Sequence, residues 1–358
     1  MTQRGNGAVT RTDLDVDAWI IDDEVIHLRE WGTHRIHPLP PDREAVTIGA
    51  GESCELRLID PSRRVSRVHA RLSREGSWWM IRDLDSKNGT RLDGARRPMA
   101  ALAPGVEIGL GRITLIAESR GLIALRGFLA RLLGWSADRL AAIDHALRAL
   151  RMAAAQRGSL TVCGQGDLVP IVHSLHLRTL GAGRPFIVCD PRRRSSAASV
   201  RAAVSRREGL SAMATAGGGT LCMRTRRLPR DFFEVSLAVR DPASRVQLAV
   251  CTEEVDARTL LANPIVIPPL ARRRAELDRI IEEYAHDAVQ ALAADATGFV
   301  RADRDWVIEH SASSLPEIEK GTRRLVAIRQ AGSITQAAGR LGMSHVALAQ
   351  WIGRRRLP

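Results

Sequence analysis

The spacing of apolar residues changes near residue 120, and this change limits the possible folds more than any other feature of the chain. Residues 18–118 contain short runs rich in Val, Ile, Trp and Thr, separated by Gly, Asp and Pro, which predict many short strands. Residues 122–157 carry apolar residues at helical spacing, and from residue 159 short wholly apolar runs alternate with helical stretches. We therefore expect an all-β sandwich followed by an α/β layer fold with a buried parallel sheet.

The rest of the chain is predicted to be helical. Residues 271–290 and 317–331 have the spacing of amphipathic helices, and a pair of short helices around Gly342 follows. A chain of 358 residues is long enough for two or three domains. The changes of pattern divide it into a flexible tail (1–17), a β domain (18–118), an α/β core (119–270), a helical segment (271–316) and C-terminal helices (317–358).

Composition argues against several classes of protein. No apolar run reaches the length of about 18 residues that a membrane span needs, and the first residues lack the apolar core of a secretion signal. The five cysteines are scattered and none forms a CxxC pair, so we expect no zinc ribbon or disulfide framework, and a reducing cytoplasm as the location. The histidines and acidic residues show no spacing typical of a hydrolase triad or a metal site. We therefore expect neither an enzyme nor a cofactor or metal.

The charge points to a polyanionic partner. The formal net charge is +13, and the chain has only two lysines, Lys87 and Lys320, beside 51 arginines. The excess of Arg over Lys is typical of a GC-rich genome, but the positions of the charge are more informative. Residues 191–230 hold ten arginines against one acid, and residues 321–358 hold seven arginines and no acid. Nucleic acid is the commonest partner of so basic a chain.

Three motifs occur in order in the β region. Gly49 ends a predicted strand, the sequence Ser66-Arg67-Val68-His69 follows, and Lys87-Asn88-Gly89 closes a hairpin. Together they resemble the forkhead-associated (FHA) domain, and the resemblance covers residues 18–118. It implies an eleven-strand sandwich whose loops at one end bind phosphothreonine peptides.

The resemblance also assigns roles to these residues. It implies that Ser66, Arg67, Lys87 and Asn88 bind the phosphopeptide, that His69 is a buried strut behind Ser66, and that Gly49 and Gly89 shape the loops. Several donors on a rigid scaffold suit a phosphate dianion.

One position departs from the family. Ala50 stands where the family has an arginine that binds phosphate. Loss of that arginine costs about 1.5–3 kcal/mol of binding free energy, the usual contribution of a hydrogen bond to a charged group. We expect Arg63 or Arg64 to take its place. The alternative is a sandwich that binds its partner without phosphate.

Residues 134–290 resemble the AAA+ domain of bacterial enhancer-binding proteins, the sigma-54 activators. The resemblance rests on the order of short motifs, among them Leu133-Gly134-Trp135-Ser136, Leu160-Thr161-Val162-Cys163-Gly164, Ala216-Gly217-Gly218-Gly219-Thr220 and Ile267-Pro268-Pro269-Leu270. It implies an α/β core, with a lid-like helical remnant in residues 271–316.

The residues that AAA+ catalysis requires are absent. The phosphate loop reads Gly164-Gln165-Gly166-Asp167 and has no lysine, and Arg224-Thr225 replaces the acidic pair that holds magnesium. No GAFTGA-like sequence lies between the second and third strands, where Arg192, Arg193 and Arg194 stand instead. We expect a degenerate nucleotide site at Gly164, Gly166, Asp167 and Arg224. One interpretation is a pseudo-ATPase that serves as a spacer or dimerisation platform. The other is a site that binds nucleotide without hydrolysis, with Arg224 in place of magnesium.

Residues 332–358 have the signals of two short helices joined by a tight turn. Ser333 and Ser344 are expected as N-caps and Gly342 as a left-handed helix end. The pattern resembles the Fis-type helix-turn-helix that closes enhancer-binding proteins, and such a pair places its second helix in a DNA major groove. The side chains expected to face DNA are those of Ser344, His345, Ala347, Gln350, Arg354 and Arg355. Small and apolar residues share one face of the first helix, namely Ile334, Ala337, Ala338 and Leu341. The residues of the second helix that are expected to face inward are Val346, Leu348 or Ala349, Trp351 and Ile352.

The three parts together predict a cytoplasmic, dimeric, DNA-binding transcriptional regulator. Its FHA domain would bind a phosphothreonine-containing or other protein, and its sigma-54-activator-like middle would lack a motor. The competing interpretation is a scaffold of Ser/Thr kinase signalling, in which the last helices only pair subunits.

Overall fold

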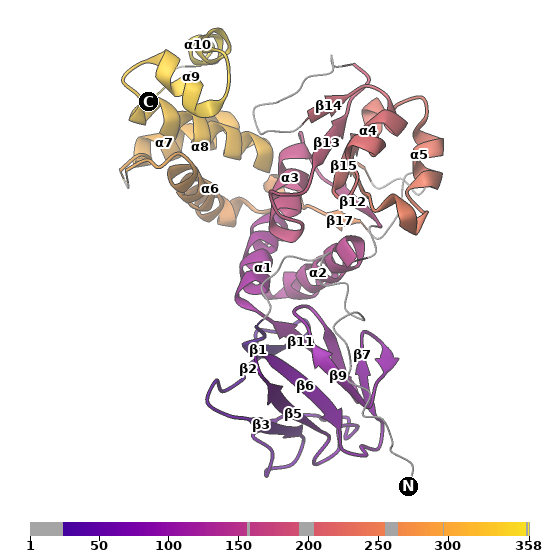
Figure 1. Ribbon diagram of the computed structural model, residues 1–358. Coiled ribbons are helices and arrows are strands. Elements are labelled where there is room, and N and C mark those ends of the chain that lie inside the picture. Colours follow the sequence, from indigo (N-terminus) through magenta and orange to yellow (C-terminus); the bar gives the residue numbers. More distant parts are fainter. Residues whose placement is uncertain are drawn as a thin grey trace. The chain divides into compact units, whose positions relative to one another are not determined.

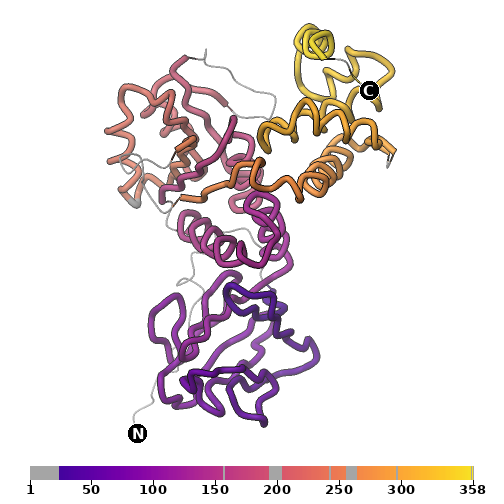
Figure 2. The backbone as a smooth tube through the Cα atoms, turned by 180° about the vertical axis from the view of Figure 1, so that it is seen from behind, coloured from indigo at the N-terminus to yellow at the C-terminus, as the bar shows by residue number. Residues whose placement is uncertain are grey.

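The computed structural model describes residues 24–155, 158–192, 204–254, 264–295, 297–355 and 357. The predicted tail 1–17 and residues Arg193, Arg194 and Arg356 lie outside these ranges. The chain forms two compact units, Met1–Arg151 and Met152–Pro358, each described separately below (Figure 1). Figure 2 shows the backbone path of each unit from behind. Within the described part of the chain, no helix is long and apolar enough to cross a membrane.

The first unit is built on a β-sandwich, as predicted. Among its described residues, one sheet has the strand order β2-β1-β11-β10-β7-β8 and the other the order β4-β3-β5-β6-β9. The strands are β1 (His27–Glu30), β2 (Ile36–Pro38), β3 (Ala45–Gly49), β4 (Leu56–Arg57), β5 (Ala70–Glu75), β6 (Trp78–Asp83), β7 (Thr90–Leu92), β8 (Ala95–Arg96), β9 (Met99–Leu102), β10 (Glu107–Leu110) and β11 (Ile113–Glu118).

Side chains alternate along these strands and fill the core between the sheets. Leu28, Leu72 and Ile108 point inward and are fully buried. The strand-like sequence at residues 55–60 contributes only β4, because Asp60 begins a turn. The short strands β7, β8 and β9 were not predicted. They are two to four residues long, too short for an alternating pattern to appear in the sequence.

Two helices cover the outer face of the six-stranded sheet. They are α1 (Arg120–Leu133) and α2 (Leu140–Ala155). Ile116 alternates with the inward-facing Leu115 and Ala117, yet is only 3% exposed, as expected beneath a covering layer. The sequence assigned residues 119 onward to the α/β core, but α1 and most of α2 belong to the first compact unit.

A buried ion network explains why these helices join the sandwich. The Arg29 guanidinium on β1 lies 2.9 Å from Glu118 on β11 and 2.5 Å from Asp144 on α2, and all three side chains are almost fully buried. Near the end of α2, Arg151 pairs with Asp93 at 2.6 Å, and Arg148 pairs with Glu107. The helices therefore extend the sandwich as one body.

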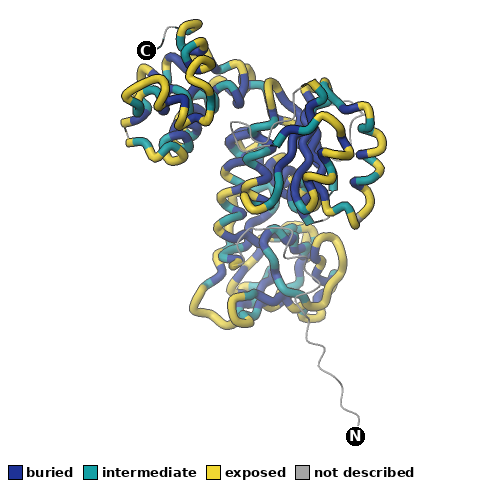
Figure 3. The backbone as a smooth tube through the Cα atoms, turned by 45° about the horizontal axis from the view of Figure 1, so that its top comes forward, coloured by how far each residue is buried: buried dark blue, intermediate teal, exposed yellow. Residues whose placement is uncertain are grey.

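The second unit contains the predicted parallel sheet. Among the described residues its order is β14-β13-β15-β16-β12-β17, and every pairing is parallel. The strands are β12 (Ser159–Cys163), β13 (Phe186–Cys189), β14 (Val204–Arg206), β15 (Thr220–Arg224), β16 (Gln247–Thr252) and β17 (Ile265–Val266). The central strands are buried along their whole length (Figure 3). The edge strand β14 was not predicted, because its three residues include a serine and an arginine.

Helices cover both faces of this sheet. α3 (Val169–Thr179) lies on one side, and α4 (Gly209–Thr215) and α5 (Phe232–Ala238) lie on the other (Figure 1). His176 of α3 hydrogen-bonds Thr220 of β15 at 2.8 Å. On the opposite face, Ala212 and Val235 pack with Met223 in one apolar core.

The C-terminal part of the second unit is helical. Its helices are α6 (Leu277–Ala291), α7 (Arg301–Ser311), α8 (Leu315–Gln330), α9 (Ile334–Leu341) and α10 (His345–Gly353). The predicted helix at 271–290 begins late, since short 3-10 turns at 270–272 and 274–276 follow Pro268 and Pro269. The predicted division between residues 316 and 317 falls inside α8, which begins after Ser314 with a proline in its first turn.

Candidate functional site

Backbone hydrogen bonds hold two loops of the sandwich together at the ends of β3 and β5. The amide of Ala50 donates to the Ser66 carbonyl at 3.0 Å, and that of Gly51 donates to the Arg67 carbonyl at 2.8 Å. A Cβ atom on Gly49 would lie 2.3 Å from the Arg67 oxygen, so only glycine permits this approach. The segment that carries Ser66 and Arg67 is therefore fixed from below.

Ser66 occupies the centre of this arrangement. Its amide donates to Nδ1 of His69 at 3.1 Å, and its hydroxyl oxygen accepts from the Lys87 amide at 3.0 Å. The hydroxyl hydrogen remains available to a ligand. His69 is fully buried, and burial lowers the pKa of its ring, although Gly89 and Asp83 oppose this effect. A neutral ring with a free lone pair on Nδ1 is the form that accepts from Ser66.

Asn88 lies beside Ser66 in the loop after β6. Its side-chain nitrogen donates to the Arg64 carbonyl at 2.7 Å, which leaves its carbonyl oxygen for a peptide amide. The loop begins at Asp83, which accepts from the Ser86 and Thr90 hydroxyls at 2.7 Å. Burial raises the pKa of Asp83, but these hydrogen bonds outweigh it and the net pKa is lowered.

The cations expected around the loops are exposed. The side chains of Arg64, Arg67 and Lys87 form no ion pair within the described residues. Asp60 fixes the backbone before Ser66 by accepting from the amides of Arg64 and Val65 at 2.5 and 2.6 Å. Sequence reasoning missed Asp60, although an aspartate that begins a turn is a local signal for such a loop.

The residues expected to form a degenerate nucleotide site meet at the carboxyl ends of the strands of the parallel sheet. Gly164, Gly166 and Asp167 follow β12, and Arg224 ends β15. The chain crosses from β12 toward one edge of the sheet and from β16 toward the other, and ligands of α/β sheets bind where strand order reverses in this way. A pocket of about 270 Å³ lies there, lined by Asp167, Arg224 and the end of β16.

Charges within this pocket are already paired. The Arg224 guanidinium donates to Asp167 at 2.9 and 3.1 Å and lies 3.5 Å from the buried Asp190. Arg227 also pairs with Asp190, and Arg226 pairs with Glu253 at 2.5 Å. Burial lowers the pKa of Arg224, but Asp167 more than compensates and the net pKa is raised.

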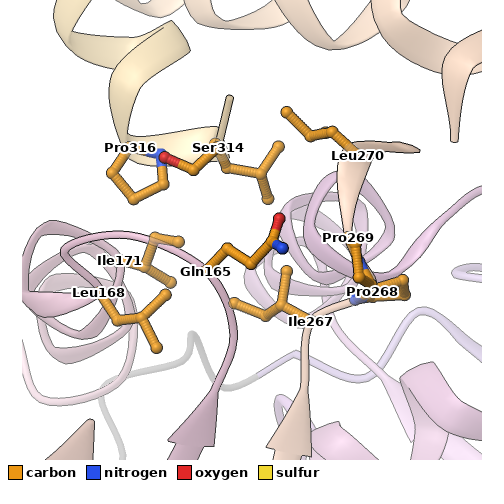
Figure 4. Close-up of a pocket in the computed structure, with 10 residues that line it drawn as sticks. Gln165, Leu168, Ile171, Ile267, Pro268, Pro269, Leu270, Ser314 and Pro316 are labelled. Atoms are coloured by element: carbon orange, nitrogen blue, oxygen red, sulfur yellow. The ribbon is translucent and has the colours of Figure 1, made fainter. Parts of the chain in front are cut away.

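A second pocket beside the phosphate-type loop is small. It holds only about 10 Å³ and is lined largely by apolar side chains, including Leu168, Ile171 and Ile267. Figure 4 shows Ser314 and Pro316 above it and Gln165 between them and Ile267. A Cβ atom on Gly166 would lie 2.6 Å from the Ser314 hydroxyl, so the start of α8 presses on the loop.

The end of the chain has the predicted caps. The Ser333 hydroxyl accepts from the Gln336 amide and the Ser344 hydroxyl from the Ala347 amide, both at 3.2 Å. Gly342 has φ of 64° in the left-handed region. These three predictions are confirmed.

The predicted outer face of α10 is exposed. It comprises Ser344, His345, Ala347 and Gln350, with Arg354 after the helix. Arg355 differs, because its guanidinium lies over the Trp351 ring at 5.1 Å. One inward prediction was wrong. Val346 is 51% exposed, since the core is already filled by Ala337, Ala338, Leu341, Leu348 and Trp351, and Ile334 at the start of the apolar face of α9 is 42% exposed.

Comparisons with known proteins identify one part of the chain. The FHA domain family matches residues 46–111, which include all the loops around Ser66 and Asn88. Residues 46–111 are an FHA domain. FhaB, an FHA domain-containing protein of Mycobacterium tuberculosis H37Rv, is 38% identical over 73 residues, and so is FhaB of Mycolicibacterium smegmatis. The match covers 20% of this chain and 46% of each relative, so the chain spans about half the length of these relatives.

Solved structures are similar over the same part. An FHA domain from work on phosphothreonine-dependent FHA interactions is 30% identical, with coverage of 26% of this chain and 95% of that one and a TM-score of 0.24. EmbR of M. tuberculosis, solved with a low-affinity phosphopeptide, is 28% identical, with coverage of 26% and 24% and a TM-score of 0.24.

Proposed function

We propose that this chain is a DNA-binding transcriptional regulator that is recruited through phosphothreonine. The observation that carries the proposal is the arrangement of the FHA loops. Ser66, Asn88 and their neighbours converge on one fixed surface, and the cations beside them lack carboxylate partners among the described residues. Such a surface stabilises a dianion without first breaking an internal ion pair.

Each recognition residue has a defined task. The Ser66 hydroxyl donates to a phosphate oxygen, because its own oxygen already accepts from the Lys87 amide. Arg67 and Lys87 neutralise the phosphate, and the Asn88 carbonyl oxygen accepts from a peptide amide. Arg64 supplies charge in place of the arginine that Ala50 replaces.

The C-terminal helices form the DNA-binding half of this proposal. α9 and α10 meet at the left-handed Gly342, and the start of α10 exposes His345 and Gln350. Polar side chains on such a helix read base edges, and Val346 contacts a thymine methyl group. Arg354 binds phosphate, whereas Arg355 supports Trp351. We propose that this pair is a Fis-type helix-turn-helix and that the chain binds DNA as a dimer in the cytoplasm.

The α/β core acts as a fixed platform and has no motor function in this proposal. A carboxylate, Asp167, occupies the place where nucleotide phosphates need cations, and Arg224 is committed to it. The pocket beside Ser314 is only about 10 Å³ in volume, and the charges that line the larger pocket at Arg224 are already paired. We infer that this region is a pseudo-AAA+ domain that carries out no ATP hydrolysis, and that the chain acts by occupying DNA or bridging to a partner.

Peptide binding tests the proposal. Short peptides with threonine or phosphothreonine are titrated into the full-length chain and its Ser66→Ala, Asn88→Ala and Ser73→Ala variants. Ser73 supplies a matched control hydroxyl on β5. We expect binding only of the phosphorylated peptide, weakened about tenfold to a hundredfold by Ser66→Ala and unchanged by Ser73→Ala. Equal affinity for both peptide forms would refute phosphothreonine recognition.

A further inference from the structure

Two further arginines lie near the loops that carry Ser66 and Asn88. Arg96 comes from β8, and Arg112 comes from the turn between β10 and β11. Neither belongs to the motifs that mark the FHA loops. Strand pairing brings both toward the recognition end, since β8 pairs with β7 and the β10–β11 turn contacts Arg64.

Arg96 lies directly over the loop. A Cβ atom on Gly89 would be 2.4 Å from Nε of Arg96 and 2.9 Å from its Cζ, so the guanidinium covers the residue that follows Asn88. Gly111 packs closely against Arg64, because a Cβ atom on Gly111 would be 2.7 Å from the Arg64 carbonyl carbon. Arg112, the next residue, is exposed.

Neither of these cations has a counter-charge among the described residues, whereas other arginines of the same unit do. Arg74, Arg148 and Arg151 each pair with a carboxylate. No ion pair within the described residues involves the cations at the recognition end, which are Arg63, Arg64, Arg67, Lys87, Arg96 and Arg112. The acids nearest in sequence are mostly committed, because Asp60 and Asp83 accept from loop amides and hydroxyls.

The positive charge at the recognition end is larger than one phosphate requires. The proposed function already assigns Arg64, Arg67 and Lys87 to the phosphate, and their three charges are enough for a single dianion. A planar guanidinium with free donors is suited to a second carboxylate or phosphate group. An anionic ligand can pair with such a guanidinium without first breaking an internal ion pair.

We propose that the FHA domain binds a segment with two anionic groups, a phosphothreonine and a further acidic or phosphorylated side chain nearby, and that Arg96 and Arg112 bind the second group. This inference rests on the proposed phosphothreonine recognition and narrows its ligand class. Arg96 is then a specificity residue.

The test uses alanine-rich peptides with the full-length chain. One has a single phosphothreonine, a second set adds another phosphothreonine at successive positions on either side, and a third set adds glutamate there. Each is titrated by calorimetry into the wild-type chain, Arg96→Ala, Arg96→Ala with Arg112→Ala, and the control Arg71→Ala. Arg71 is an exposed arginine on β5. Circular dichroism confirms that every variant is folded.

We expect the best peptide with two anionic groups to bind the wild type about tenfold more tightly than the singly phosphorylated one. Arg96→Ala should remove most of this preference and leave affinity for the single phosphothreonine within about twofold. Arg71→Ala should keep the preference. The phosphothreonine and glutamate sets show which acid supplies the second group.

Three results would overturn the inference. One is a wild type without preference for a second anionic group, and another is a preference that Arg96→Ala and the double variant retain. The third is a duplex DNA fragment that competes for this surface as well as the peptides, because the cations would then form a nucleic-acid surface. Loss of binding to every phosphopeptide would instead refute the proposed function itself.

Discussion

Replacement of Asp144 by alanine should detach α2 from the sandwich. Asp144 accepts from Arg29 at 2.5 and 3.0 Å and from the Gly32 amide at 2.7 Å. Removal leaves a fully buried guanidinium with Glu118 as its remaining carboxylate partner. Loss of one member of a buried pair typically costs about 3–5 kcal/mol.

Hydrogen exchange of the full-length chain measures this loss locally. Because Asp144→Ala destabilises the first unit, the slowest amides of β1 and β11 should exchange about a hundredfold to several thousandfold faster. Amides of α7 and α8 should be unchanged. Asp138→Ala, which removes an exposed carboxylate just before α2, is the matched control and should alter nothing.

A double replacement separates the ion pair from other effects. Arg29→Met with Asp144→Leu removes both charges, and Glu118 keeps His27 at 2.7 Å and Arg126 at 3.4 Å. Its loss of protection should be smaller than that of Asp144→Ala alone. If Asp144→Ala were as mild as Asp138→Ala, the network would not hold the helices on the sandwich, and the reasoning would be refuted.

Two further predictions concern pH and nucleotide. Burial lowers the pKa of His69 below its unfolded value of about 6.5, so the stability of the FHA domain should be constant above that pH and fall as pH decreases toward the folded pKa. Unfolding midpoints of the wild type and of His69→Gln, measured across this pH range, check this prediction. An equal dependence of the midpoint on pH in both proteins would contradict it. ATP should neither bind nor raise the melting temperature, because Arg224 is paired with Asp167; a shift with ATP that Arg224→Ala abolishes would show a working nucleotide site.

Local signals explain what the sequence predicts well. Ser333, Gly342 and Ser344 act within one helical turn, so their roles can be read from neighbouring residues. The central strands of the sandwich and of the parallel sheet are long enough to show their pattern. The loops around Ser66 and Asn88 are recognisable because their residues recur in a fixed order.

Contacts between distant residues are not readable in this way. Arg29 and Asp144 are 115 residues apart, and nothing near either position predicts that they pair. Arg96 reaches Gly89 only through the pairing of β7 with β8, two strands too short to show a pattern. Val346 follows the helical spacing of an inward residue, yet Leu348 and Trp351 already fill the available core.

We propose that this chain joins FHA recognition to sequence-specific DNA binding. The most direct test is a selection of genomic fragments by the full-length chain at two salt concentrations. It is run beside a Gln350→Ala, Arg354→Ala double variant and the control Arg301→Ala, which removes an exposed arginine of α7.

The account predicts enrichment of a short palindromic site. The double variant should lose this enrichment and the control should retain it. Affinity for the site should fall with salt by a log–log slope of about −0.9 for each phosphate contact. Weak binding to all fragments alike, unchanged in the double variant, would contradict the account and leave a scaffold that binds proteins alone.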